Sequence, residues 1–287
     1  MLDLIVIPLA AGLVILAMNA YLGLHVIRRG VIFVDLAFAQ IAAVGSMVAL
    51  LMGADAGTTT SYLMSFGFTL AGALLFSFTR LEESPVPQEA IIGISYVIAS
   101  AAVILLASFT AEGAEHIKET LTGSLIWVTW PTVFKLAGVY AAIGIFHFVM
   151  RSKMLGVTFK PATVKHFHFW DFIFYLTFGI AITFSVNLAG VLMIFSTLVI
   201  PAVIAFLYTH RFGAALAIAW GVGAVALVGG LVVSFVWDIT TGPLLVLSFG
   251  AVLVLAALVR PLTGIKPERA DPVDPERSAA PLAVVVD

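Results

Sequence analysis

Long apolar runs constrain this sequence more than any other feature. The hydrocarbon core of a bilayer is about 30 Å thick, so a helix needs about 20 apolar residues to cross it once. Such runs recur along most of the chain, and the only charged residues within them are Asp35 and Lys135. Each predicts one membrane-spanning helix, at residues 4–24, 31–52, 62–79, 90–109, 131–150, 212–237 and 243–259.

One further run, residues 172–208, is too long for a single crossing because it has 37 residues without a charge. Its middle, Asn187-Leu188-Ala189-Gly190, favours a turn, so we expect two spans there. The sequence therefore predicts an all-α polytopic membrane protein, a bundle of about nine transmembrane helices over residues 1–260. Residues 261–287 are rich in Pro, Glu, Asp and Arg, which predicts a disordered tail.

Basic residues orient the bundle, because they concentrate in cytoplasmic loops. With the N-terminus outside and the C-terminus in the cytoplasm, all but Lys118 and Lys135 of the 14 basic residues lie inside. Since Arg28 is the first basic residue, the first apolar run lacks the charged start of a cleaved signal peptide, and we expect it to remain as a span.

Composition excludes several classes of protein. With 62% hydrophobic and 10% charged residues, against about 25% charged in soluble domains, the chain is not a soluble enzyme. It has no Cys for disulfides or thiolate metal ligands and no basic run for nucleic acid. It also lacks a Gly-x-x-x-x-Gly-Lys-Ser/Thr phosphate loop and an intramembrane catalytic motif, so any ATP that drives transport would be hydrolysed on another chain.

Asp35 is the charged residue that most needs an explanation, because a charge within a span is costly. One interpretation is a pairing with Arg28 or Arg29 near the interface, and the other is a role in a translocation pathway. Gln40 lies one turn further in a segment of small residues and should face a neighbouring helix or an aqueous path. Pro201, inside a span, predicts a kink of the kind that lines transporter cavities.

Three other regions are candidates. His147 could carry a proton or bind a ligand, although a packing role is the simpler interpretation. Residues 151–171 resemble a short amphipathic helix on the membrane or on a partner. An external loop groups side chains that could bind a divalent cation or form a solvated surface: Glu112, Glu115, His116 and Glu119.

The segment from Gly190 to Ala205 (GVLMIFSTLVIPAVIA), which includes Ser196 and Pro201, resembles without a gap a signature of the ABC permeases for zinc, manganese and iron(II) uptake. Residues 89–94 are similar to the family's E-A-x-I-G-I motif, and residues 121–129 to its L-x-G-(D/S) segment. Residues 28–45 occupy the family's second span. The likeness extends over residues 28–260.

The resemblance implies a permease subunit in the plasma (inner) membrane that carries a divalent transition metal, zinc or manganese first. It implies three protein partners: a cytoplasmic ABC ATPase, an extracytoplasmic solute receptor and a second permease copy, with a homodimer expected. The pathway residues would be Asp35, Gln40, Ser196 and Pro201, with Asp35 as metal ligand. The segment that docks on the ATPase would be Phe159, Lys160, Pro161, Ala162, Thr163 and Val164.

The chain departs from the family pattern at two positions. Ala39 stands where the family has a His four residues after its Asp, and Lys160 stands where it has Asp. Two alternatives therefore remain: an ABC permease of the same fold with a non-metal substrate, and a secondary carrier coupled to protons through Asp35 or His147.

Overall fold

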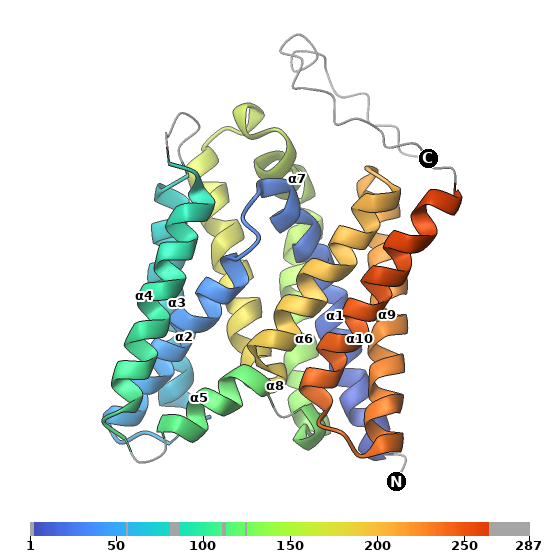
Figure 1. Ribbon diagram of the computed structural model, residues 1–287. Coiled ribbons are helices and arrows are strands. Elements are labelled where there is room, and N and C mark those ends of the chain that lie inside the picture. The colour runs from blue at the N-terminus through green and yellow to red at the C-terminus, as the bar shows by residue number, and fades with distance from the viewer. Residues whose placement is uncertain (1–2, 56, 81–85, 111–112, 124, 264–287) are drawn as a thin grey trace.

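The computed structural model describes residues 3–55, 57–80, 86–110, 113–123 and 125–263, and the regular structure of these residues is helical (Figure 1). Short 3₁₀ turns lie at Leu125–Trp127 (η1), Pro161–Thr163 (η2) and Arg260–Thr263 (η3). The α-helices are α1 (Asp3–Arg29), α2 (Val34–Leu51), α3 (Thr59–Phe78), α4 (Gln88–Ala107), α5 (Gly113–Thr122), α6 (Trp130–Val149), α7 (Arg151–Phe159), α8 (Phe167–Tyr208), α9 (Phe212–Trp237) and α10 (Thr241–Val259).

Among the described residues, eight helices are long and apolar enough to cross a membrane. They are α1, α2, α3, α4, α6, α8, α9 and α10, and every predicted apolar run lies on one of them. The chain is therefore a multi-pass helical membrane protein, as the sequence predicts. α5 and α7 are shorter and lie at opposite ends of the bundle (Figure 1).

Helix α8 passes through the bundle twice. Near its start, Asp171 accepts a hydrogen bond from Arg29, at the end of α1. Near its other end, Phe206 lies under the guanidinium group of Arg28, which also contacts His210. Both ends of α8 therefore lie beside the same end of α1, and Figure 1 shows the two halves meeting at the opposite edge. Counting α8 twice gives the nine crossings that the sequence predicts.

A single residue, Gly190, reverses α8. Its backbone has φ 74° and ψ 158°, a region that only glycine adopts readily. A Cβ at Gly190 would lie 2.4 Å from the backbone nitrogen of Gly123, and one at Gly123 would lie 2.2 Å from the carbonyl carbon of Ala189. The predicted turn at 187–190 is thus narrower than expected, since the chain stays helical through Ala189 and two glycines let the backbones touch.

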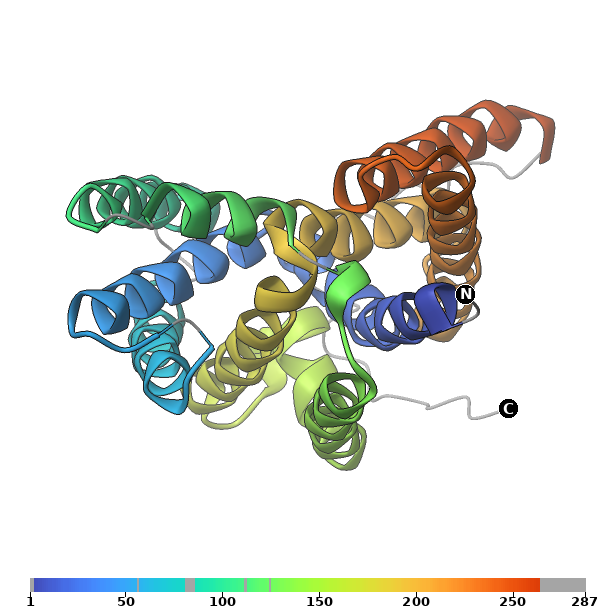
Figure 2. The same cartoon turned by 90° about the horizontal axis from the view of Figure 1, so that it is seen from below.

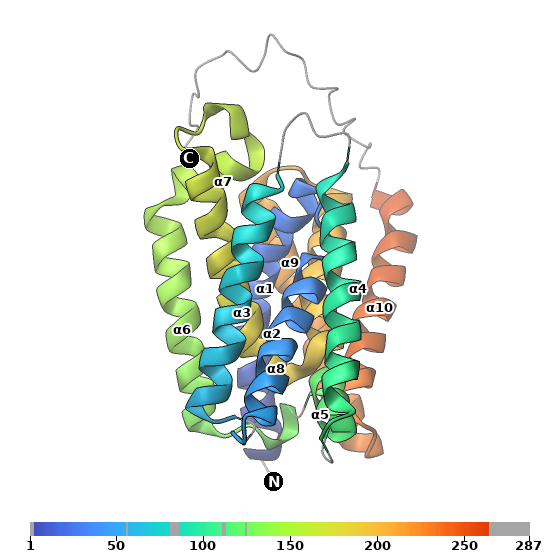
Figure 3. The ribbon, with the colours of Figure 1, turned by 90° about the vertical axis from the view of Figure 1, so that its left-hand side faces the viewer.

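Helix α1 is the centre of one side of the bundle, where it packs against α6, α8 and α9 (Figure 2). Helix α2 packs among α3, α4 and α8, and Figure 3 shows it between α3 and α4. Over the most apolar 18 residues of each helix, 67% of α2 is buried, whereas only 22% of α4 and 11% of α10 are buried. Helices α4 and α10 therefore present most of their apolar surface outward.

One expectation from the sequence needs correction, and another lies mostly outside the described residues. Residues 151–171 do not form one amphipathic helix, because α7 ends at Phe159, η2 follows, and His166 takes a left-handed conformation (φ 58°) immediately before α8. Of the predicted tail 261–287, the structure describes only residues 261–263, which belong to η3.

Candidate functional site

Asp35 lies in the first turn of α2, and its position results from the loop that precedes the helix. Residues 30–33 carry the chain down from the end of α1 before α2 begins (Figure 1). Asp35 is 1% exposed. Backbone N–H groups of Asp35 and Leu36 are close to the carboxylate, yet neither of its oxygens meets hydrogen-bond geometry with any described residue. The structure thus buries a carboxylate that has no direct partner among the described residues.

The interface pairing considered for Asp35 is wrong, because both neighbouring arginines are engaged elsewhere. Arg29 Nη1 donates to Asp171 Oδ1 at 2.7 Å, and its guanidinium group lies 3.5 Å from the ring centroid of Phe174. Arg28 stacks over Phe206, with its guanidinium group 4.7 Å from the ring centroid. Neither arginine is paired with Asp35, and its role in a translocation pathway stays a prediction.

Small side chains follow Asp35 along the buried face of α2. They border a cavity of about 10 Å³, which is about the room of one water molecule. This cavity adjoins Ala39, where the family pattern has a histidine, and it is too small for an imidazole ring. Its lining comes from α2, α5 and α8: Ala39, Ala42, Ala43, Ser46, Thr120, Thr183, Val186 and Asn187.

The other predicted pathway residues are buried but do not converge on Asp35 through any described hydrogen bond. Gln40 is 7% exposed on α2. Ser196, in the second half of α8, donates its hydroxyl to the carbonyl of Leu192 at 2.8 Å. Pro201 lies inside the same half-helix and is buried. This half-helix does contact the start of α2 close to Asp35. There the ring of Phe33 stacks on the ring of Phe195, with 6.3 Å between the ring centroids.

The external acidic group is only partly described. Helix α5 includes positions 115, 116 and 119, so Glu115 and Glu119 are one turn apart on a helix rather than in an irregular loop. The side chains of Glu115, His116 and Glu119, and the whole of Glu112, lie outside the described residues. Among the residues that the structure does describe, no group of three or more His, Cys, Asp or Glu side chains could hold a metal ion.

The predicted coupling segment lies at the end of the bundle where α1 ends and α2 begins. Phe159, Lys160 and Ala162 are exposed, while Pro161 and Val164 are partly buried. Thr158 anchors the segment inside the bundle, because its hydroxyl bonds His25 Nδ1 at 2.7 Å and accepts from Arg29 Nε at 3.1 Å. The outer surface of α7 and η2 is thus exposed, and the inner surface of α7 is hydrogen-bonded to α1.

Asp171 is a residue that the sequence analysis missed. Its Oδ1 accepts from both Arg29 Nη1 and Arg80 Nη1, each at 2.7 Å, and its side chain is fully buried. This carboxylate links the ends of α1 and α3 to the start of α8. Its sequence position, directly after an apparent surface segment, gave no sign of burial. The available signal was the spacing of Tyr21, His25 and Arg29, which places three polar groups on one face of α1.

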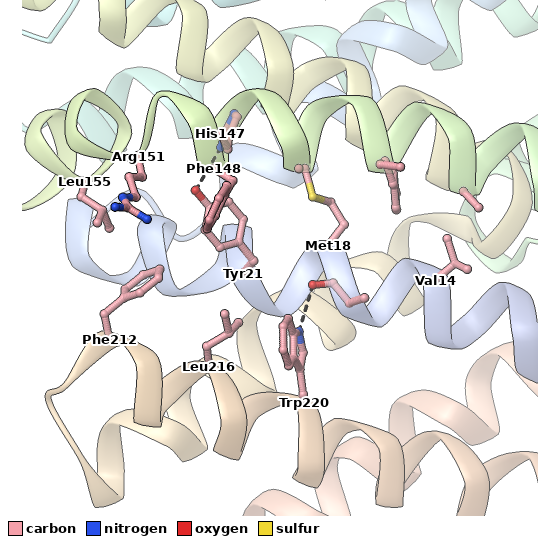
Figure 4. A pocket seen from close by; sticks show the side chains of 15 residues that line it. Val14, Met18, Tyr21, His147, Phe148, Arg151, Leu155, Phe212, Leu216 and Trp220 are labelled. Atoms are coloured by element: carbon pink, nitrogen blue, oxygen red, sulfur yellow. Dashed lines mark hydrogen bonds between the residues drawn. The ribbon is translucent and has the colours of Figure 1, made fainter. Parts of the chain in front are cut away.

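His147 is a satisfied interior residue. Its Nδ1 is 3.1 Å from the Tyr21 hydroxyl and its Nε2 is 2.8 Å from the Thr177 hydroxyl. It borders a mostly apolar groove of about 580 Å³ between α1, α6 and α9 (Figure 4). Arg151 and Leu155 lie at one end of this groove, and Trp220 spans it to donate to the carbonyl of Ala17 at 3.0 Å. None of the residues that line this groove belongs to α2.

Comparisons with known proteins agree with this architecture. The chain is 22% identical over 255 residues to the manganese transport system membrane protein MntC of Listeria innocua, covering 86% of this chain and 87% of that protein. It is 27% identical to an uncharacterized membrane protein of Synechocystis sp. over 187 residues, covering 64% of this chain and 66% of that protein.

A solved structure shares the fold. PsaBC from Streptococcus pneumoniae, solved in complex with a Fab, superposes with a TM-score of 0.72 at 20% identity, over 87% of this chain and 89% of that one. The model of the ABC 3 transport family matches residues 1–260, which include every crossing described above. The chain is therefore a member of the ABC 3 transport family and has the fold of its permeases.

Proposed function

We propose that this protein is the membrane-spanning subunit of an ATP-driven importer for a divalent transition metal, with Mn²⁺ as the first candidate. The observation that carries the proposal is the family match over residues 1–260 together with the buried, unpartnered carboxylate of Asp35. Similarity to MntC, a manganese transport protein by name, supports the choice of metal. A chain of this kind transports and does not itself catalyse a reaction.

The donor atoms of the buried α2 face also favour manganese over zinc. Asp35 and Gln40 offer oxygen, whereas Ala39 offers no imidazole. Carboxylate and carbonyl oxygens suit Mn²⁺, while imidazole suits Zn²⁺. Zinc remains the second candidate cargo. The pathway would run along α2 past Asp35, with the second half of α8, including Ser196 and Pro201, beside it.

Three protein partners belong to the proposal. An ATPase subunit would dock on the exposed surface of Phe159, Lys160 and Ala162, because the chain has no phosphate loop of its own. A solute receptor would deliver the metal at the other end of the bundle. A second copy would cover the apolar outer faces of α4 and α10, which lie along the same side of the bundle (Figure 2).

The proposed orientation, with α7 in the cytoplasm, is testable because the chain contains no cysteine. Single cysteines at Thr240, in the connection between α9 and α10, and at Lys165, between η2 and α8, would be unique labelling sites. In intact cells, a membrane-impermeant maleimide should label Thr240→Cys and leave Lys165→Cys unlabelled. Labelling of both variants in opened cells is the control. The reverse pattern in intact cells would invert the topology.

The transport function is tested by uptake of radioactive Mn²⁺ and Zn²⁺ in cells that lack their own importer. Uptake should require this chain and its ATPase partner together, and an ATPase whose phosphate-loop lysine is replaced should abolish it. Asp35→Ala should reduce uptake to background while the complex still assembles, because the buried carboxylate would be a ligand on the path. Uptake driven by a pH gradient without the ATPase would instead identify a proton-coupled carrier.

A further inference from the structure

The groove of about 580 Å³ beside α1 is open space between three membrane-spanning helices. Its floor is α1, and its walls are α6 and α9, which both pack on α1 but make few contacts with each other (Figure 4). Small residues of α6 make the room, because the lining of this wall includes Ala137, Ala141 and Gly144. A Cβ at Gly144 would meet nothing within 4 Å outside its own helical turn. The groove can therefore hold a ligand without any movement of the helices.

The polar side chains along the middle of the groove form hydrogen bonds within the protein. The Tyr140 hydroxyl donates to the carbonyl of Ala181 at 3.2 Å. The Tyr21 hydroxyl and Nδ1 of His147 lie 3.1 Å apart and bond each other. The indole N–H of Trp220 is also used, in its bond to α1. With these groups engaged, the middle of the groove presents mainly apolar atoms, which suit a hydrocarbon chain better than a polar ligand.

Arg151 places a positive charge at one end of the groove. It is exposed at the start of α7, directly beyond the end of the span formed by α6. Figure 4 shows its guanidinium group turned toward the groove, and this group lies 5.3 Å from the ring centroid of Phe148. The ion pairs of the described residues both involve Asp171, so Arg151 has no carboxylate partner among them. A planar guanidinium group binds phosphate through two parallel hydrogen bonds, so this end of the groove suits an anionic phosphate group.

The length of the groove corresponds to one leaflet of a bilayer. Its α6 lining extends from Ala137 to Phe148, which is about 16 Å along a helix axis. The hydrocarbon core is about 30 Å thick, so the chains of one leaflet occupy about 15 Å. An acyl chain that enters the groove beside Arg151 would therefore reach Ala137 near the middle of the membrane. A cation at the interface and an apolar channel one leaflet deep together match the two parts of a phospholipid.

We infer that this groove binds an anionic phospholipid from the leaflet on the side of α7, with the phosphate at Arg151 and one acyl chain along α1 between α6 and α9. The inference goes beyond the transport function and does not depend on which cargo the protein carries. All the lining residues belong to α1, α6, α7 and α9, so a second copy on the outer faces of α4 and α10 would leave the groove open to lipid. The bound lipid would connect α9 with α6 and with the start of α7.

The test titrates the full chain, copurified with its ATPase partner in detergent, with phosphatidylglycerol or phosphatidylcholine. Both lipids carry bromine atoms on one acyl chain, which quench tryptophan fluorescence on contact. Trp220 is 45% exposed and lines the groove, so the part of the quenching that is lost in Trp220→Phe reports lipid in the groove. Phosphatidylglycerol, which is anionic, should quench Trp220 at about fivefold lower concentration than phosphatidylcholine, because one basic residue favours an anionic lipid by about that factor.

Two variants separate the headgroup contact from the chain contact. Arg151→Gln removes the charge and should make the two lipids quench Trp220 at similar concentrations. Its matched control is Arg260→Gln, at the same end of the bundle but outside the groove lining, which should keep the preference for phosphatidylglycerol (Figure 1). Ala141→Phe fills the open space on the α6 wall and should abolish quenching of Trp220 by either lipid, while the variant still elutes as a single species.

Three results would overturn the inference. One is an unchanged preference for phosphatidylglycerol in Arg151→Gln, and another is quenching of Trp220 that survives Ala141→Phe. The third is equal quenching of the wild type and Trp220→Phe at saturating phosphatidylglycerol, which would mean that the groove is closed to lipid or holds a protein segment instead. Each of these results leaves the proposed transport function untouched, because metal uptake is measured separately.

Discussion

Replacement of Asp171 by alanine is expected to cause one of the largest losses of stability in this chain. Its fully buried Oδ1 holds Arg29 and Arg80 at 2.7 Å each, and the Arg29 side chain is itself fully buried. Removal of one partner from a buried ion pair costs about 3–5 kcal/mol, because the other charge stays buried without a counter-ion. The fraction of monodisperse protein that survives heating, measured by size-exclusion chromatography, should fall sharply.

A double variant separates lost charge balance from lost packing. Arg29→Met with Asp171→Leu replaces the two buried charges by apolar groups and leaves Arg80, which is 16% exposed, close to solvent. Such replacements are often neutral, so the double variant should be more stable than Asp171→Ala. Asp55→Asn, at an exposed acidic position, should melt like the wild type. An Asp171→Ala protein with the wild-type melting temperature would show that the arginines find other partners.

The same substitution should also disturb transport in any molecules that fold. Arg29 donates both to Asp171 and to Thr158, so it connects α8 with the segment proposed to dock on the ATPase. Loss of Asp171 frees Arg29 and loosens that connection. ATP hydrolysis by the complex is then expected to continue while metal uptake per ATP falls.

Substitution of Gly190 by alanine is the second change with a large expected effect. The backbone angles of Gly190, φ 74° and ψ 158°, cost a non-glycine residue about 1–3 kcal/mol. An added Cβ would also lie 2.4 Å from the nitrogen of Gly123, which is backbone and cannot rotate away. The backbone at Gly190, where α8 reverses, would therefore be pushed away from the backbone at Gly123. We expect Gly190→Ala to yield little folded protein in detergent extracts.

A matched control for Gly190→Ala is Gly250→Ala, in the middle of α10. A Cβ at Gly250 meets no atom within 4 Å, and alanine favours a helix over glycine by about 0.8–1.0 kcal/mol. This variant should fold at least as well as the wild type. Gly123→Ala should resemble Gly190→Ala, because the two glycines face each other. Normal yields of Gly190→Ala would mean that the reversal of α8 does not depend on this contact.

The family resemblance predicted the function better than the individual charged residues did. Motifs around Pro201 and Glu89 are local in sequence, so they can be recognised without the fold, and the family match over residues 1–260 agrees with them. The role of Asp35 could not be settled in the same way. Its nearest basic neighbours in sequence, Arg28 and Arg29, are occupied by Phe206 and Asp171, which lie far along the chain.

The sequence by itself determined the crossings, because each crossing depends only on a run of apolar residues long enough for the bilayer. It also determined where α8 reverses, since the glycine that permits the reversal is visible as a residue type. Only the tertiary structure decided which buried polar groups have a hydrogen-bond or ion-pair partner. The pairing of Asp171 with Arg29 and Arg80, and the hydrogen bond from the Phe33 N–H to Glu89, depend on contacts between helices that are distant in the chain. Such contacts leave no local pattern, because each partner alone looks like an interfacial charge.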